Sequence, residues 1–174
     1  MFKKLFLLAI FFITTNCSPS YKGNDTVEHF GQTIFNAFVN DNFNEYKKYI
    51  ITFDDRVSLL DSTNFSEAKK NAYLRKYDEE TPELAKTIEG YFTSVKNQAK
   101  EKNIVFNKVK FEKIEYRLSK YTNNTYALVN IVFTYNNVKY FIRLLDCMNT
   151  NRGWVMSGDV YLEIYPVEWY EKIL

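Results

Sequence analysis

The stretch YALVNIVFTYNNVKYFIRLLDC, residues 126–147, decides the fold. It holds two runs rich in aromatic and β-branched residues, 126–135 and 138–147, which are joined by Asn136-Asn137. Such runs are typical of strands, and asparagine tolerates the positive φ angles that a two-residue hairpin turn requires. The sequence therefore predicts an antiparallel hairpin as the second and third strands of a sheet.

Further strands are expected on both sides of this hairpin. Before it, the apolar alternation of residues 109–118 changes phase, and a bulge near residues 112–113 would reconcile the two halves. A turn at residues 123–124 joins this first strand to the hairpin. After it, residues 154–164 alternate as one continuous fourth strand. We expect a curved, antiparallel, four-stranded meander.

The N-terminal half has the period of amphipathic helices instead. A capping residue followed three positions later by Glu marks three starts, and a Thr-Pro pair marks a fourth. These starts are Asp25, Asn42, Asn64 and Thr81-Pro82. The third helix is expected to end near Tyr77 and the fourth near Lys102.

Helices over about 25–103 followed by strands over about 105–165 indicate the α+β class, with the helices packed on the sheet. No repeat or low-complexity linker divides the chain after residue 24. We therefore interpret residues 25–174 as one domain.

The first 16 residues are typical of a signal peptide. Lys3 and Lys4 precede nine consecutive apolar residues, LFLLAIFFI, which are too few to span a bilayer that needs about 20. These two lysines account for the whole excess of 23 basic over 21 acidic residues. The rest of the chain is neutral, so nucleic acid is not expected as a partner.

Cys17 follows this apolar run directly and precedes Ser18-Pro19-Ser20. The arrangement resembles the lipobox of bacterial lipoproteins, in a looser form known from the Bacteroidota. The resemblance implies that residues 1–16 are removed, that Cys17 carries the lipid, and that residues 17–24 form a tether. It further implies a lipid anchor in the cell envelope, with the periplasmic face of the outer membrane favoured. An ordinary secreted protein and an uncleaved anchor are the alternatives.

A second resemblance concerns the domain. The phrase NDNFNEY at residues 40–46 and the run GWVM at residues 153–156, set among helices followed by a meander, are similar to the nuclear transport factor 2-like, or cystatin-like, family. This resemblance implies a cone-shaped α+β fold over residues 25–164. The family includes isomerases, dehydratases, polyketide cyclases and binding domains, so it does not define one function.

Enzymes of that family use an acid in the cavity between helices and sheet. By strand alternation Asp146 shares a face with Tyr140, and together with Tyr116 and Trp154 it is our candidate pocket. In the alternative interpretation Asp146 lies at a strand end and faces solvent. We assign no catalytic residue, because nothing in the sequence orients one.

The remaining reactive residues are expected to be structural. His29 has no visible partner, and Cys147 is expected as a buried thiol on the face of Phe141 and Arg143. Two cysteines and one histidine cannot build a four-ligand zinc site, and no glycine-rich phosphate loop is present. The sequence therefore predicts neither a metal nor a cofactor.

Three functions are compatible with these observations. We favour a non-catalytic envelope domain that binds a small molecule or an envelope protein. The second is a small cavity enzyme that uses Asp146, which leaves enzymatic activity undecided. The third is a structural module that forms a homodimer through the outer sheet face and Trp169-Tyr170.

Overall fold

The computed structural model of the protein describes residues 24–165. The predicted signal peptide, Cys17, most of the predicted tether and residues 167–174, for which the sequence predicts a short terminal helix or arm, lie outside the described residues. Helices precede strands, as the sequence predicts, and the class is α+β. The elements are α1 (Val27–Val39), α2 (Phe43–Lys47), α3 (Phe53–Asp61), α4 (Glu67–Glu101), the 3-10 turn η1 (Phe106–Lys108), β1 (Lys110–Tyr121), β2 (Asn124–Tyr135), β3 (Val138–Thr150), β4 (Gly153–Met156) and β5 (Val160–Ile164).

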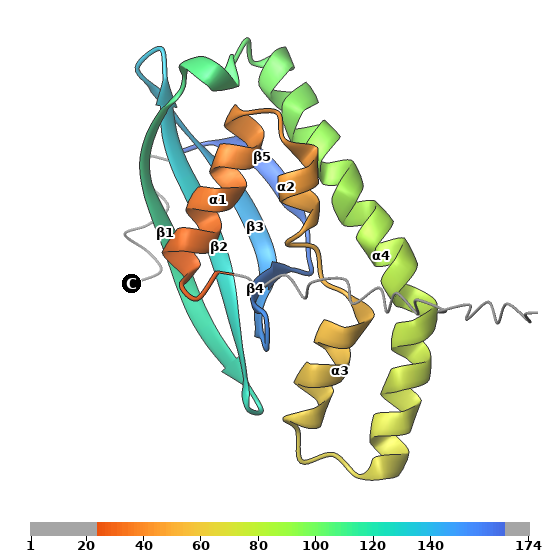
Figure 1. Ribbon diagram of the computed structural model, residues 1–174. Helices are drawn as coiled ribbons and strands as arrows, with labels where there is room; N and C mark the ends of the chain where they lie inside the picture. The colour runs from red at the N-terminus through yellow and green to blue at the C-terminus, as the bar shows by residue number, and fades with distance from the viewer. Residues whose placement is uncertain (1–23, 166–174) are drawn as a thin grey trace, which may run out of the picture.

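The strands form one curved antiparallel sheet in the order β1-β2-β3-β4, and β5 also pairs with β3. The helices α1 and α2 lie over one face of this sheet, and α4 runs beside them along its length (Figure 1). Helix α3 packs on α4 and lies near the tip of the β1–β2 hairpin (Figure 1).

The central hairpin is confirmed. Asn136 and Asn137 have φ angles of 50° and 63°, the left-handed values that a tight turn of this kind needs. The predicted bulge is confirmed too, since the β1–β2 register shifts between Phe111 and Lys113. The first turn lies one residue earlier than expected, because Asn124 already pairs with Tyr121.

The prediction of one continuous fourth strand is wrong. Its residues divide into β4, which pairs with Cys147–Thr150, and β5, which pairs with Tyr140–Leu144. Asp146 lies between these two parts of β3 with a φ of 49°. Opposite it, Gly158 approaches so closely that a Cβ there would lie 2.7 Å from the carbonyl oxygen of Leu145. The backbone of β3 bulges here, so the β2–β3 register shifts between Ala127 and Val129 and the strand on the other side divides into β4 and β5.

The helix starts are partly confirmed. Asn42 caps α2, but Thr26 and Ser66 replace the expected caps Asp25 and Asn64. The helix α3 was not expected at all. The capping patterns thus located the starts of α1, α2 and α4 to within two residues.

The division of residues 67–101 into two helices is wrong, because α4 is continuous through Pro82. Thr81, expected as a cap, instead donates its hydroxyl to the carbonyl of Tyr77 in the preceding turn. Pro82 removes one backbone donor, which is costly in a helix interior. Packing against α3 on one side of Pro82 and against β5 on the other keeps the helix continuous.

Aromatic rings fill the space between helices and sheet. Phe38 from α1 stacks on Phe92 of α4 with ring centroids 4.9 Å apart and meets the edge of Tyr46 at 5.5 Å. Tyr46 and Tyr49 are completely buried, and the Tyr46 hydroxyl donates to the carbonyl of Ile88 over 3.0 Å. The centre of the fold is therefore a packed core.

The folded part begins within the expected tether. Asn24 is buried, its side-chain amide donates to the Thr33 hydroxyl over 3.0 Å, and its carbonyl accepts from the Trp154 backbone over 3.2 Å. Asn24, the last residue of the predicted tether, is thus part of the packed domain.

Candidate functional site

The expected orientation of Asp146 is wrong. Strand alternation placed it on the face of Tyr140, Ile142 and Leu144, yet its side chain is exposed whereas those three are buried. The physical reason is the bulge at its positive φ angle, which reverses the alternation of everything that follows in β3.

The other three residues of the expected pocket do not gather around it. Tyr116 lies exposed on the edge strand β1 and donates to a Glu28 carboxylate oxygen over 2.7 Å. Tyr140 is buried and stacks on Phe133, with ring centroids 5.8 Å apart. Trp154 of β4 is buried and pairs with Asn149, near the end of β3 that lies farthest from Tyr140.

The bulge also redirects Cys147. The thiol faces the helix-side core next to Leu144, and the predicted position on the face of Phe141 and Arg143 is wrong. Burial raises the pKa of the Cys147 thiol well above its usual range, and the nearby charge of Asp146 adds to the effect. Such a thiol is a poor nucleophile. His29 is exposed on the first turn of α1.

A different hollow is the candidate site. A cavity of about 150 Å³ lies between α3, the N-terminal half of α4 and the β1–β2 hairpin, with Met148 of β3 also contributing to it. Its other lining residues are Arg56, Leu59, Leu60, Thr63, Phe65, Tyr73, Tyr77, Tyr121, Thr122, Asn124 and Tyr126.

Side-chain amides close one end of this cavity. Asn124 donates to the carbonyl of Leu59 over 3.1 Å, and Asn123 donates to the carbonyl of Ser62 over 2.6 Å. The two carbonyls belong to the last turn of α3 and to its C-cap Ser62, where backbone acceptors lack partners within the helix. The hairpin tip thereby holds the C-terminal end of α3 in place.

Tyrosine and phenylalanine rings line the cavity walls. Phe65 stacks on Tyr73 with centroids 5.7 Å apart, and Tyr73 lies 5.8 Å from Tyr77. Burial is the first cause that raises the pKa values of Tyr77 and Tyr126 above their usual range. Both phenols are therefore neutral at physiological pH and able to donate a hydrogen bond.

Arg56 is the one charged residue among the described residues that line the cavity. Its side chain is only 14% exposed, and its guanidinium carbon lies 4.6 Å from the centroid of the Tyr77 ring. Its Nη1 atom lies 3.8 Å from the Glu80 carboxylate, beyond hydrogen-bond distance, and is buried without any acceptor.

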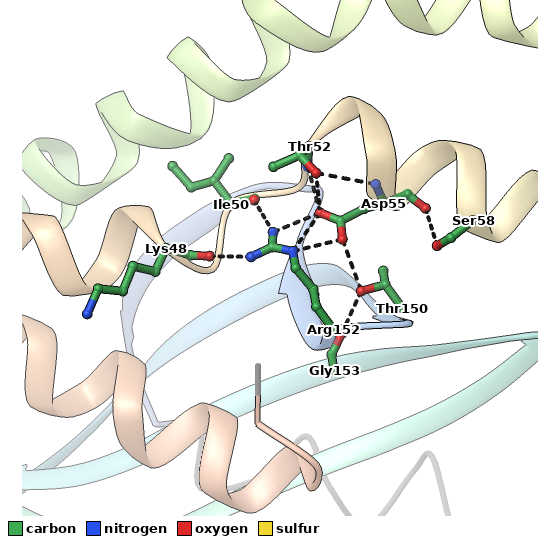
Figure 2. A network of polar contacts seen from close by, with 8 residues as sticks. All are labelled: Lys48, Ile50, Thr52, Asp55, Ser58, Thr150, Arg152 and Gly153. Atoms are coloured by element: carbon green, nitrogen blue, oxygen red, sulfur yellow. Dashed lines mark hydrogen bonds and ion pairs between the residues drawn. The ribbon is translucent and has the colours of Figure 1, made fainter. Parts of the chain in front are cut away.

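A buried ion pair positions α3 and hence Arg56. Asp55 accepts from Arg152 of the β3–β4 turn at 2.7–3.0 Å, and Arg152 also donates to the carbonyls of Lys48 and Ile50, as Figure 2 shows. Thr150 adds a bond of 3.1 Å to Asp55. These contacts join α2, α3 and the sheet at one point.

The capping box of α3 completes this network. The Thr52 hydroxyl accepts from the Asp55 backbone over 3.3 Å, while the Asp55 carboxylate accepts from the Thr52 backbone over 2.8 Å (Figure 2). Burial alone raises the pKa of Asp55, but hydrogen bonds from Arg152 and Thr52 and the arginine charge outweigh it and lower that pKa. Asp55 is thus a structural carboxylate.

The sequence does contain a capping pattern that marks the start of α3. Thr52-x-x-Asp55 is a capping box that precedes Leu59 and Leu60, in the same pattern as the starts that were recognised. No local pattern shows that Arg56 faces a cavity, because the cavity walls come from five separate helices and strands.

A second hollow of about 540 Å³ lies beside α4, over Phe43 and Phe92. Two of its charged residues already have partners, since Glu89 pairs with Lys47 over 2.6 Å and Lys96 pairs with Asp41. The smaller cavity, with its incompletely paired arginine, is therefore the stronger candidate.

Within residues 24–165, no group of three His, Cys, Asp or Glu side chains is placed to hold a metal ion. In the same range, no helix has both the length and the apolar character that crossing a bilayer requires. Comparisons with protein-family models, with curated proteins and with solved structures find no match to this chain.

Proposed function

We propose that this protein is a bacterial envelope lipoprotein whose domain binds a small ring-bearing ligand without catalysis. The observation that carries the proposal is the cavity of about 150 Å³ with aromatic walls. The hollow is partly open to solvent, since Tyr121 and Thr122 in its lining are exposed, and its volume is of the order that holds a single aromatic ring. Among the described lining residues there is no His, Cys, Asp or Glu to act as a base or nucleophile.

The proposal includes a fold of the nuclear transport factor 2-like type. Helix α1 packs on β1 and β2 of a curved antiparallel sheet, which supports a cone-like arrangement (Figure 1). In this protein, however, aromatic side chains occupy the space between helices and sheet. The ligand site therefore lies beside the core, under α3.

The enzyme alternative has lost its main support, because it depended on an inward-facing Asp146 and that side chain is exposed. The homodimer alternative depends partly on Trp169-Tyr170, which lie outside the described residues. Binding at the cavity is the function that the geometry favours.

Neutral benzyl alcohol tests the cavity. The wild-type chain is expected to unfold at a higher temperature in its presence, since a ligand that binds only the folded state stabilises it by mass action. Leu60→Trp should abolish this shift, because Leu60 is buried and lines the cavity, so a larger side chain fills it. Differential scanning calorimetry measures the unfolding temperatures of wild type and Leu60→Trp with and without benzyl alcohol.

The matched control is Leu118→Trp, which adds the same ring at an exposed position of β1. It should retain the full shift with benzyl alcohol. An equal shift in Leu60→Trp and in wild type would show that the alcohol binds elsewhere and would contradict the proposed site.

Lipid anchoring is tested at Cys17. Cys17→Ser should move the protein from the membrane fraction to the soluble fraction of cells and prevent its labelling by a fatty acid, because stable anchoring depends on acyl chains. Cys147→Ala is the matched control at the other cysteine, which is buried, and it should remain lipidated. Mass spectrometry that finds an unmodified Cys17 at the mature N-terminus would reject the anchor.

A further inference from the structure

Two arginines of this protein are almost equally buried but differ in their partners. Arg152, 19% exposed, makes five hydrogen bonds to Asp55 and to two backbone carbonyls. Arg56, 14% exposed, has an ion-pair contact of 3.8 Å from its Nη1 to Glu80 and no hydrogen bond from its guanidinium to any described residue. Its Nη1 is fully enclosed, so a ligand in the cavity would meet the other guanidinium nitrogens, for which the described residues provide no acceptor.

Glu80 does not provide that partner. Its carboxylate lies 3.8 Å from the Arg56 Nη1 and 3.6 Å from Lys76, and its side chain is half exposed. It is thus a shared, solvated counter-charge rather than an acceptor for the guanidinium. The Tyr77 ring covers one face of Arg56 but offers no acceptor in the plane of the nitrogens.

Arg56 provides the positive charge of the cavity, and the half-exposed Glu80 carboxylate beside its Nη1 offsets part of it. Arg56 is the single ionised group among the described residues that line the cavity, and the Lys69 ammonium lies 3.6 Å from the centroid of the Phe65 ring at the cavity wall. An anion bound there meets a guanidinium that water screens only weakly. A carboxylate matches the planar fork of arginine better than a single-atom acceptor does.

The volume limits the rest of the ligand. A cavity of about 150 Å³ holds one ring, and the rings of Tyr73, Tyr77 and Phe65 provide faces and edges for it to pack against. Resting on the binding function proposed above, we propose that the ligand is a small carboxylic acid carrying a single ring, with its carboxylate held by Arg56.

Benzoate and benzamide form the probe pair, because they share a ring and a planar head group but differ in charge. Isothermal calorimetry on the full chain in lipid nanodiscs, corrected with empty nanodiscs, should give benzoate at least about tenfold tighter binding than benzamide, equivalent to about 1.4 kcal/mol. Arg56→Met should remove this preference while leaving benzamide binding within about twofold.

Arg75→Met is the matched control, since it removes an exposed arginine from α4. It should retain the tenfold preference. Benzamide binding by Arg56→Met also shows that this variant keeps a folded cavity. If Arg56→Met does not fold, Arg56→Lys replaces it and should weaken benzoate binding selectively, because lysine lacks the planar fork.

The outcomes separate this inference from the proposed function. Equal binding of benzoate and benzamide in wild type, with both lost in Leu60→Trp, would overturn the carboxylate while the binding cavity stands. A benzoate preference that persists in Arg56→Met would overturn the role of Arg56. Failure of benzoate to bind, with benzyl alcohol still stabilising the wild type, would overturn the inference alone.

Discussion

Replacing Arg152 by Met is expected to lower the free energy of unfolding by about 3–5 kcal/mol, the usual cost of breaking a buried ion pair from one side. Methionine keeps the length and packing of the side chain but leaves the Asp55 carboxylate, which is only 4% exposed, without its counter-charge. The carbonyls of Lys48 and Ile50 lose their donors as well. Urea titration followed by circular dichroism measures the loss.

The matched control is Arg117→Met, which removes the same charge from an exposed position on β1. A change within about 0.5 kcal/mol is expected there, as for most surface substitutions. Arg152→Lys should fall between the two, since it keeps the charge and loses the fork. A loss below about 1 kcal/mol for Arg152→Met would show that the network is not what holds α3.

The pH dependence of this loss has a definite sign. In wild type the pKa of Asp55 is lowered, so its contribution to stability is complete above its unfolded pKa of about 3.9 and is lost as pH falls through the lower folded value. Without Arg152, burial is opposed only by the hydrogen bonds from Thr52 and Thr150, so that pKa should be higher in the variant than in wild type. The difference in stability between wild type and Arg152→Met should therefore be largest near neutral pH and shrink as pH falls from the higher pKa of the variant to the lower pKa of wild type.

Local patterns were sufficient for much of this fold. The Asn136-Asn137 turn follows from the conformations that asparagine tolerates, and the bulge after Phe111 follows from a phase change that is visible in the sequence. Asn42 follows from its capping pattern. Each of these features depends on interactions within a few residues of the chain, which is why sequence alone predicts them.

The sequence-based predictions were wrong where contacts between residues far apart in the chain determine the backbone conformation. Alternation along 138–147 continues in the sequence, but in the fold a bulge interrupts it at Asp146, where Gly158 of the neighbouring chain segment approaches Leu145 closely. Pro82 ends a helix by local rules, yet packing on both sides of it keeps α4 continuous. Long-range packing overrides local preference at both places.

The candidate site illustrates the same limit within two neighbouring residues. Asp55 and Arg56 are adjacent in the sequence, and by local pattern alone they resemble an exposed charge pair at a helix start. In the fold the Asp55 carboxylate contacts Arg152, 97 positions away, and Arg56 lines a cavity whose other walls include α4, β1, β2 and β3. Only the tertiary structure reveals that one of them is fully paired and the other is not.

The second large loss of stability is expected in the aromatic core between the helices and the sheet. Phe38→Ala should reduce the free energy of unfolding by about 3–5 kcal/mol, the range for deleting a buried phenylalanine ring. Phe38 is 1% exposed and contacts the rings of Phe92, Tyr46 and Phe106 at centroid distances of 4.9, 5.5 and 5.8 Å. These rings come from three other elements, so no single neighbour can move to refill the space.

Phe65→Ala is the comparison, because Phe65 is only partly buried and stacks on Tyr73 at the cavity wall. Its loss should stay below about 2 kcal/mol, since less apolar surface is involved. If Phe38→Ala does not fold, Phe38→Leu should still cost about 1 kcal/mol or more and can be measured by the same urea titration. Equal losses at positions 38 and 65 would mean that the space between helices and sheet is no better packed than the cavity. The ligand site would then have to be sought in the centre of the fold.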